Sequence, residues 1–352
     1  MKVIHIESGL GNQMLSYCEL LAIQKMNPQE VCFIETMVYD IPECNDTICQ
    51  WNGYELDRIF GIRTKNIREL FSNDDWKSIM EEVRASEFWS KNWNWPVYIS
   101  CALNKHGLQL NNLLGDYEKE ENHDDASKRG LIGKLRGKLT NGTRLGNYLR
   151  RLITSKGPAS SVQQGWHDRV FIKSEKNILA GQQLVLKYCG AGIDTIEEDV
   201  RNTFVFPDFV SQKNREFATF LCNCNSVFIH ARRGDMLSAN GWCYKYGYFR
   251  RAVKYIKKKV ENPVFVFFTN TGSIQWCKEN ARIFGLDYNK DKVFFVDWNT
   301  GEESYRDMQL MALCKHGIIT NSSFGWWGAY FIKNPNKITI SPLTEIYTTY
   351  HC

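Results

Sequence analysis

From residue 226 onward the chain alternates short apolar strands with amphipathic helices, and this alternation limits the fold more than any other feature. The strands are rich in valine, isoleucine and phenylalanine, and longer stretches with helical periodicity separate them. The expected strands are 227–231, 264–268, 293–296, 318–320 and 337–340, with helices near 248–260, 273–284, 304–315 and 326–332. Because helical crossovers return the chain to the same edge of a sheet, the pattern predicts a parallel, doubly wound sheet.

The amino-terminal residues open a second unit of the same kind. A predicted strand over Lys2–Ile6 leads into the glycine turn 8–13 (SGLGNQ) and then into an apolar helical pattern from 14 to 26. A strand, a glycine turn and a helix in this order direct backbone N–H groups toward a bound anion. The turn lacks the G-x-G-x-x-G spacing of nicotinamide and flavin sites. We therefore expect two Rossmann-like α/β domains, 1–215 and 216–352.

Composition excludes several classes of protein. The 352 residues suffice for two domains with separate cores, and the net charge of +5 is too mild to indicate nucleic-acid binding. Twelve cysteines occur without a C-x-x-C pair or zinc-type spacing, so we expect free thiols in a reducing compartment. The opening MKVIHI is too short for a signal peptide, and no window approaches the ~18 apolar residues of a membrane-spanning helix. We expect a cytoplasmic protein.

A charged segment, HARRGD at 230–235, follows the apolar run Val227–Ile229. Unpaired charge inside a dry sheet is costly, so we expect the strand to end at an open site. Arg232 and Arg233 each carry a planar fork of donors and a permanent charge, which suits a diphosphate. The alternative is a structural turn in which an arginine pairs with Asp235.

A polar tripeptide, Asn321-Ser322-Ser323, lies between the strand 318–320 and the helix near 326–332. Serine hydroxyls and free N–H groups at a helix N-terminus can cradle a phosphate. Taken alone, ordinary helix capping by serine is the simpler interpretation. However, ligands of parallel sheets bind outside the carboxyl ends of strands, and the two arginines follow another such end. The combination favours a diphosphate site.

Four segments occur in one order: GLGNQM at 9–14, HARRGD at 230–235, SYRDMQLMALCKH at 304–316 and NSSFGWWGA at 321–329. Together they resemble the α-1,2-fucosyltransferases of glycosyltransferase family eleven. The similarity is dense over about 226–335 and at 1–26, and thin between 90 and 180. It implies a GT-B-like α/β fold with two Rossmann-like domains facing a cleft. It also implies inverting transfer of L-fucose from GDP-fucose to a galactose 2-hydroxyl without a required metal.

The resemblance implies roles for individual residues. His230 would contact guanine or ribose, Arg232 and Arg233 the β-phosphate, and Asp307 the N1–H and N2–H donors of guanine. The domain 216–352 would bind the donor, and the glycine turn of 1–215 would reach it from the acceptor side. The expected donor-binding residues are Gly9, Gly11, Asn12, Gln13, His230, Arg232, Arg233, Asp307, Asn321, Ser322, Ser323 and Phe324.

Two positions depart from the family pattern. After the strand 264–268 the chain reads Thr269-Asn270-Thr271, where the family often has an aspartate-containing segment. Gly325 stands where the family usually has serine. Both departures concern fine contacts to the donor.

The chemistry of fucosyl transfer agrees with these residues. Negative charge develops on the β-phosphate as the bond to fucose breaks, and some group must stabilise it. The chain contains no Asp-x-Asp for a metal, so we expect Arg232 and helix N–H groups to act without a metal or other cofactor. Inversion also needs a base or a late proton transfer. Asp235 is the nearest carboxylate in sequence, although it could equally orient an arginine, and Glu7 and Glu303 are further candidates.

A stretch near 112–165 has the composition of an insertion. Between 116 and 156 an acidic run precedes a basic one, and glycines interrupt the apolar periodicity. A solvated loop is the simpler interpretation. The alternative is a basic surface that contacts anionic lipid at the cytoplasmic membrane face.

Two other functions fit the same residues: a fucosyltransferase of another linkage, and a non-catalytic protein that binds a nucleotide sugar. The second would need the arginines and serines as much as an enzyme does. The expected partners are GDP-fucose and a galactoside-containing oligosaccharide, and nucleic acid is not expected.

Overall fold

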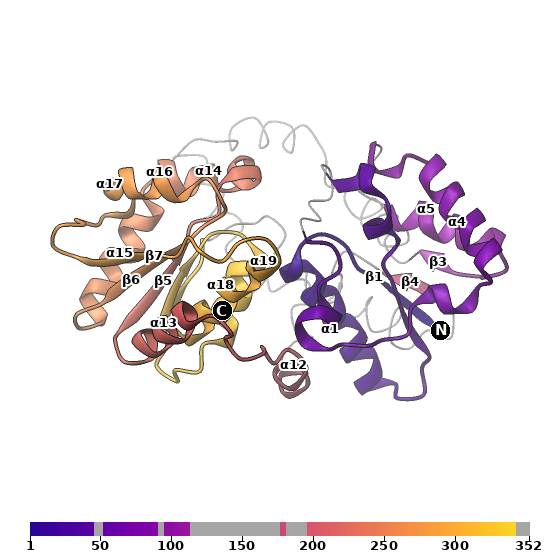
Figure 1. The fold of residues 1–352 in the computed structure, drawn as a ribbon, viewed down its shortest axis with the longest axis horizontal. Coiled ribbons are helices and arrows are strands. Elements are labelled where there is room, and N and C mark those ends of the chain that lie inside the picture. The colour runs from indigo at the N-terminus through magenta and orange to yellow at the C-terminus, as the bar shows by residue number, and fades with distance from the viewer. Residues whose placement is uncertain (46–51, 91–94, 113–176, 181–195, 343–352) are drawn as a thin grey trace, which may run out of the picture. The chain divides into compact units, whose positions relative to one another are not determined.

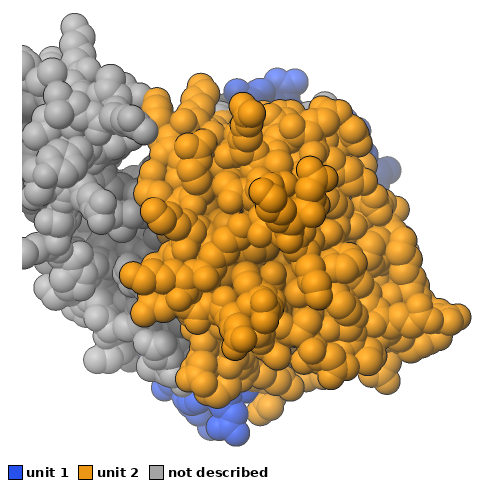
Figure 2. Space-filling model, turned by 90° about the vertical axis from the view of Figure 1, so that its left-hand side faces the viewer, with its two compact units in different colours: residues 1–57, 61–200 blue, residues 58–60, 201–352 orange. Residues whose placement is uncertain are grey.

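The computed structural model describes residues 1–45, 52–90, 95–112, 177–180 and 196–342 (Figure 1). The predicted insertion near 112–165, including its charged stretch 116–156, lies outside these residues except at its first position. The chain divides into two units. Unit 1 contains 1–57 and 61–200, and unit 2 contains 58–60 and 201–352 (Figure 2). This division falls upstream of the boundary expected at 215.

Unit 1 is built on a parallel sheet with the strand order β2-β1-β4-β3. Helices α4 and α5 belong to a buried apolar cluster with the sheet that includes Val3, Ile79 and Leu103. The strands are β1 (Lys2–His5), β2 (Cys32–Glu35), β3 (Asn111–Asn112) and β4 (Ile178–Ala180). The helices are α1 (Leu10–Met26), α4 (Asn73–Ala85) and α5 (Trp95–Lys105), with short 3-10 turns η1 (Met37–Asp40), η2 (Pro42–Cys44), η3 (Ile67–Leu70) and η4 (Phe88–Ser90). Helices α3 (Leu56–Phe60) and α12 (Glu197–Thr203) cross the unit boundaries, so that 58–60 and 201–203 belong to unit 2.

Unit 2 contains the parallel sheet predicted from the alternating pattern, with the order β7-β6-β5-β8-β9. The strands are β5 (Ser226–His230), β6 (Val264–Phe268), β7 (Lys292–Phe295), β8 (His316–Ile319) and β9 (Thr339–Ile340). The helices are α13 (Gln212–Cys222), α14 (Leu237–Lys245), α15 (Tyr248–Lys259), α16 (Ile274–Glu279), α17 (Ala281–Phe284), α18 (Tyr305–Leu313) and α19 (Ser323–Phe331), with η6 (Gly234–Met236) and η7 (Gly301–Glu303). Two α/β units with parallel sheets thus confirm the predicted fold class.

One predicted helix, 273–284, is broken into α16 and α17 at Asn280. Asn280 leaves the helical conformation, with φ −116° and ψ 38°. Its side-chain Nδ2 donates to the carbonyl of Trp276, 2.8 Å away. An asparagine that bonds a neighbouring carbonyl competes with helical geometry, which explains the interruption.

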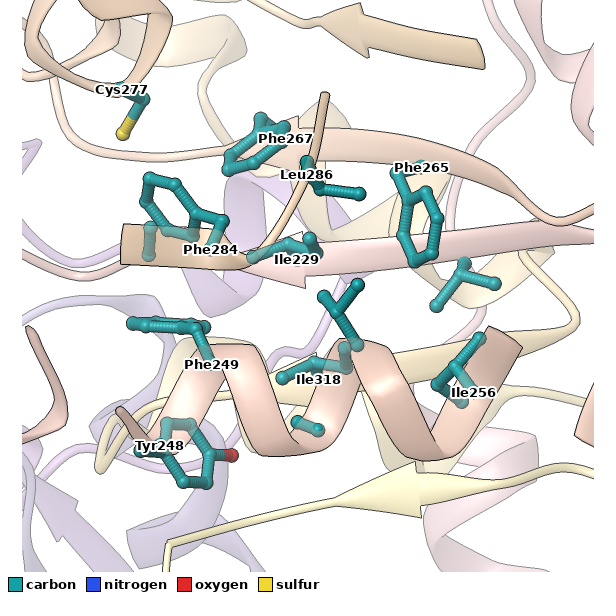
Figure 3. Packing of buried hydrophobic residues seen from close by; sticks show 14 of the residues in the cluster. Ile229, Tyr248, Phe249, Ile256, Phe265, Phe267, Cys277, Phe284, Leu286 and Ile318 are labelled. Carbon is teal, nitrogen blue, oxygen red and sulfur yellow. The ribbon is translucent and has the colours of Figure 1, made fainter. Parts of the chain in front are cut away.

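Helix α15 shows how the sheet of unit 2 is covered on one face (Figure 3). Phe249 and Ile256 on its apolar side lie in one buried cluster with Ile229 of β5 and Phe267 of β6. The register pairs Ile229 with Phe267, so the two side chains point to the same face. His230 follows Ile229 and therefore points to the opposite face, where α19 lies.

A short segment from the amino-terminal half belongs to unit 2. The ring of Phe60 contacts the rings of Phe204 and Phe206, each with a centroid separation of 5.3 Å. Arg58 Nη1 donates to the carbonyl of Glu302 at 3.0 Å. These contacts explain why 58–60 group with 201–352.

None of the helices in the described ranges is long and apolar enough to cross a membrane. Each cysteine in those ranges is a free thiol, and most are buried.

Candidate functional site

The strand order of unit 2 reverses beside its central strand, β5. The chain adds β6 and β7 on one side of β5 and then β8 and β9 on the other. The register pairs His230 with Ile319, so β5 and β8 end side by side. Ligands of open α/β sheets bind outside the carboxyl ends of strands at such a reversal. The structure therefore brings the predicted segments 230–235 and 321–324 to one edge.

Thr320, directly after β8, joins the two strand ends. Its Oγ1 accepts a hydrogen bond from the backbone N–H of Arg232 and donates to the carbonyl of His230, both at 3.2 Å. The hydroxyl of Tyr244 donates to the carbonyl of Arg232 at 2.9 Å. The backbone of Arg232 is thus held from both sides.

The segment after β6 holds the same loop from the other neighbour. Thr269 Oγ1 donates to the carbonyl of Ala231 at 2.6 Å, and the N–H of Arg233 donates to Asn270 Oδ1 at 3.0 Å. Gly234 has φ +54°, and a Cβ there would lie 2.6 Å from Asn270 Nδ2. The Thr269-Asn270 pair, a departure from the family pattern, therefore positions the arginine loop.

The imidazole of His230 is almost fully buried, with 3% of the residue exposed. Its Nδ1 has no hydrogen-bond partner among the described residues. Burial, with the charge of Arg232, lowers the pKa of His230 to about 3. The side chain is therefore neutral near pH 7 and can bond a nucleoside but not neutralise a phosphate. A Cβ at Gly325 would overlap Nδ1, which gives a reason for glycine where serine is usual.

The adjacent arginines have different surroundings. The guanidinium of Arg233 lies 3.4 Å from the ring centroid of Trp276 and 4.9 Å from that of Tyr244. Such cation–π contacts hold a guanidinium in place. Arg232 is half-buried, and the contacts described above hold its backbone. The two arginines thus differ, since the Arg233 guanidinium is stacked on aromatic rings while the loop backbone carries Arg232 at the end of β5.

The end of β8 is held by a buried amide. Asn240 is fully buried; its Oδ1 accepts from the N–H of Asn321 at 3.1 Å and its Nδ2 donates to the Asn321 carbonyl at 3.3 Å. Ser322 is the N-cap of α19, yet its side chain makes no capping hydrogen bond. The ring of Phe324 lies 5.8 Å from that of His230. The capping interpretation of Ser322 therefore finds no support in the structure.

Asp307 lies in the first turn of α18. Because α18 leads into β8, its N-terminus is at the same sheet edge as Arg232 and Ser322. Asp307 Oδ1 accepts from Asn299 Nδ2 at 2.8 Å. Burial raises the pKa of Asp307 to about 8, with the hydrogen bond from Asn299 opposing the rise. A strongly raised pKa of a buried carboxyl is a common feature of binding sites.

The glycine turn in unit 1 has a well-defined geometry. Gly9 is the N-cap of α1, while Gly11 is buried and Asn12 half-buried in its first turn. The side-chain amide of Gln13 is used within unit 1. Its Nε2 donates to the carbonyls of Ser8 and Gly53 at 2.9 and 2.8 Å, and its Oε1 accepts from the Glu55 N–H at 2.8 Å. Gln13 thus shapes the turn rather than offering its amide outward.

A buried charged cluster lies next to this turn. His5 Nδ1 is 2.5 Å from Glu35 Oε2, and His5 Nε2 is 3.2 Å from Glu7 Oε2. Burial lowers the pKa of His5, but the two carboxylates outweigh it and raise the pKa to about 10. His5 is therefore an imidazolium between two carboxylates. The apolar strand pattern of residues 2–6 does not predict this arrangement. Glu7, a candidate base, is one member of it.

The remaining candidates for the base differ in their surroundings. Asp235 lies in η6, but its side chain is outside the described part of the structure. Glu303 Oε2 accepts from Arg306 Nε at 3.1 Å. Within the described ranges, no group of three or more His, Cys, Asp or Glu side chains is arranged to hold a metal ion.

Residues 197–349 match the family model described as Glycosyl transferase family 11. This span contains HARRGD, SYRDMQLMALCKH and NSSFGWWGA, the segments that carried the resemblance. Residues 197–349 are a glycosyltransferase family 11 domain. The predicted family is thus confirmed for this part of the chain.

Relatives of the family 11 domain are named for transfer to a 2-position. The α-1,2-colitosyltransferase of Escherichia coli is 35% identical over 153 residues, covering 42% of this chain and 49% of the relative. The galactoside α-(1,2)-fucosyltransferase 1 of Saimiri sciureus is 29% identical over 147 residues, covering 38% of each. The chain thus spans half or less of these relatives. Among solved structures, fucosyltransferase NodZ from Bradyrhizobium has a TM-score of 0.47 at 10% identity, covering 93% of this chain and 91% of that chain.

Several polar residues of the family 11 domain that shape the site were not singled out from the sequence. The side chain of each makes a hydrogen bond to a residue more than 80 positions away in the sequence. Only Thr320 lay next to a recognised motif, so proximity to a strand end could have indicated it. These residues are Asn214, Asn240, Trp298, Asn299 and Thr320.

Proposed function

We propose that this protein transfers L-fucose from GDP-fucose to the 2-hydroxyl of a terminal galactose in a glycan, with inversion and without a metal. One observation carries the proposal: Arg232, Ser322 and Asp307 reach one edge of the family 11 domain from three separate segments. A guanidinium, a helix N-terminus and a carboxylate suit a diphosphate and a base bearing N–H donors. The names of the relatives support the α-1,2 linkage.

In this mechanism the acceptor oxygen attacks fucose C1 from the face opposite GDP. The bond between C1 and the β-phosphate oxygen breaks, and its electron pair leaves with GDP. Arg232 and the N–H groups at the start of α19 stabilise the developing charge. The proton of the acceptor hydroxyl passes to a carboxylate, for which Asp235 is the first candidate and Glu7 and Glu303 the others.

A second donor is supported by the name of one relative. Because the E. coli protein is named a colitosyltransferase, colitose is an alternative to fucose in the transferred position. Side-by-side assays with the two nucleotide-activated sugars and a β-galactoside separate these donors. Fucosyl product with a 1→2 linkage by NMR supports the proposal, and a different linkage or colitosyl product alone overturns it. Tight GDP binding with no turnover would indicate a non-catalytic binding protein.

We expect transfer to persist in excess EDTA. The chain has no Asp-x-Asp, and guanidinium and helix N–H groups can stabilise the leaving diphosphate instead. Initial rates before and after EDTA treatment test this. A complete loss that magnesium or manganese restores would refute the metal-free mechanism.

We expect Asp307→Asn to weaken GDP binding by about 1–3 kcal/mol, the scale of mismatched buried donors and acceptors. The asparagine would direct an N–H group at an N–H group of guanine. Calorimetry with GDP measures the loss. Unchanged affinity would mean that the carboxylate serves only the fold.

The cytoplasmic location and a contact of 116–156 with anionic membrane stay predictions, as does the galactoside-containing oligosaccharide acceptor.

A further inference from the structure

A chain of three side chains ends on Asp307. Trp298 Nε1 donates to Asn214 Oδ1 at 2.7 Å, Asn214 Nδ2 donates to Asn299 Oδ1 at 2.8 Å, and Asn299 Nδ2 donates to Asp307 Oδ1 at 2.8 Å. The members come from α13, from the loop after β7 and from α18. Asn214, at the centre, is only 2% exposed.

The direction of this chain is fixed by its first member. An indole N–H can only donate, so the atom of Asn214 that faces it must be the oxygen. The amide of Asn214 then presents its NH₂ to Asn299, whose oxygen must accept. Asn299 in turn presents its NH₂ to Asp307. Rotating either amide by half a turn would set a donor against a donor.

This chain of hydrogen bonds determines how the carboxyl of Asp307 can bind a ligand. Its Oδ1 is held as an acceptor, while Oδ2 accepts no hydrogen bond from the described residues. Each carboxylate oxygen has two lone pairs, so Oδ1 retains one after bonding Asn299. Both oxygens can therefore accept from a ligand, in a plane that Asn299 sets. Guanine offers two adjacent donors, N1–H and N2–H, whereas adenine offers an acceptor at N1.

We propose that Trp298, Asn214 and Asn299 are positioning residues that hold Asp307 as a double acceptor and thereby set the preference for a guanine nucleotide. This inference rests on the proposed function, because it assumes a GDP-linked donor. The three residues act through Asp307 and need not touch the nucleotide.

The chain also ties recognition of the base to pH. Burial holds the pKa of Asp307 near 8, Asn299 opposes the rise and Asp297 adds to it. The neighbouring cations interact with groups other than Asp307. Lys278 contacts Asp297, Lys213 lies over the ring of Trp298, and Arg306 contacts Glu303. A double acceptor must be ionised, so GDP binding releases a proton below about pH 8, and affinity rises with pH up to that value.

The test compares GDP with inosine diphosphate, which lacks the N2 amino group, by calorimetry across pH 6–9. Trp298→Phe keeps an aromatic side chain but deletes the indole N–H that is the first donor, and Asn214→Leu removes both central hydrogen bonds at similar volume. We expect each to lower GDP affinity about tenfold and to reduce the preference for GDP over inosine diphosphate. The pH at which GDP affinity levels off should move upward. Phe217→Leu is the control, because Phe217 contacts the Trp298 ring at 5.3 Å and belongs to no hydrogen bond of the chain.

The outcomes separate the inference from the proposed function. Wild-type protein that prefers inosine diphosphate or adenosine diphosphate to GDP would overturn the donor itself. Wild-type preference for GDP, with both variants matching Phe217→Leu in preference and in pH profile, would overturn only the positioning role. Circular dichroism identifies any unfolded variant, and the conservative Trp298→Phe then decides alone.

Discussion

Arg232→Lys should lower kcat about 100-fold, the usual cost of losing one preorganised donor to a developing oxyanion. An ammonium lacks the planar fork that can bind two phosphate oxygens at once. The loop itself should not move, because Thr320 and Tyr244 bond only the backbone atoms of Arg232. We therefore expect kcat to fall while KM for GDP-fucose and the unfolding temperature change little.

Steady-state kinetics with GDP-fucose and a galactoside measure this effect. Arg282→Lys is the matched control, since Arg282 is an exposed arginine of α17 in the same unit and should keep wild-type turnover. Near wild-type kcat in Arg232→Lys would show that the charge is stabilised by other groups. Arg233 is unsuitable as a control because its guanidinium stacks on Trp276.

His5→Gln should destabilise unit 1 by about 3–5 kcal/mol, the cost of breaking a buried ion pair by removing one partner. The variant leaves the carboxylates of Glu7 and Glu35 without the imidazolium between them. Hydrogen exchange of the β1 and β2 amides reports this loss in unit 1 alone. Lys25→Gln, which breaks an exposed ion pair with Asp199, should cost under about 1 kcal/mol in the same assay.

The cluster of His5, Glu7 and Glu35 also predicts that the stability of unit 1 depends on pH. The folded pKa of His5, about 10, lies above its ordinary value, so its contribution is complete below about pH 6.5 and is lost as the pH rises toward 10. The difference between wild type and His5→Gln should therefore shrink over this range. A difference that stays constant from pH 6 to 10 would show that His5 is neutral in the folded protein.

The sequence predicted the architecture of unit 2 well because its signal is local. Apolar runs mark each strand, and the strand 264–268 agrees with β6 at both ends. The glycine turn and its helix were likewise visible, although α1 begins at Leu10 rather than near 14. Helices α13 and α14 were not foreseen, and Asn280 divides a helix whose apolar periodicity runs on unbroken.

The residues of the candidate site could be predicted only in part from the sequence. Strand ends showed that 230–235 and 321–324 would meet, because all parallel strands end at one edge. No sequence pattern indicates that Arg233 stacks on Trp276 or that Asn299 bonds Asp307. Such contacts join residues that only the folded sheet brings together, and an asparagine in a loop has no pattern that identifies its partner.

The contribution of 58–60 to unit 2 limits how this protein can be recombined. Consider a chimera in which residues 1–200 come from a related protein. Phe204 and Phe206 would then pack against whatever residue that protein carries in place of Phe60. Chimeras that exchange amino-terminal halves among family 11 enzymes would need to retain Arg58–Phe60 as a graft. Without it, Phe204 and Phe206 would each keep other aromatic neighbours but expose the ring face that Phe60 covers, and the exchange would fail through aggregation rather than through loss of chemistry.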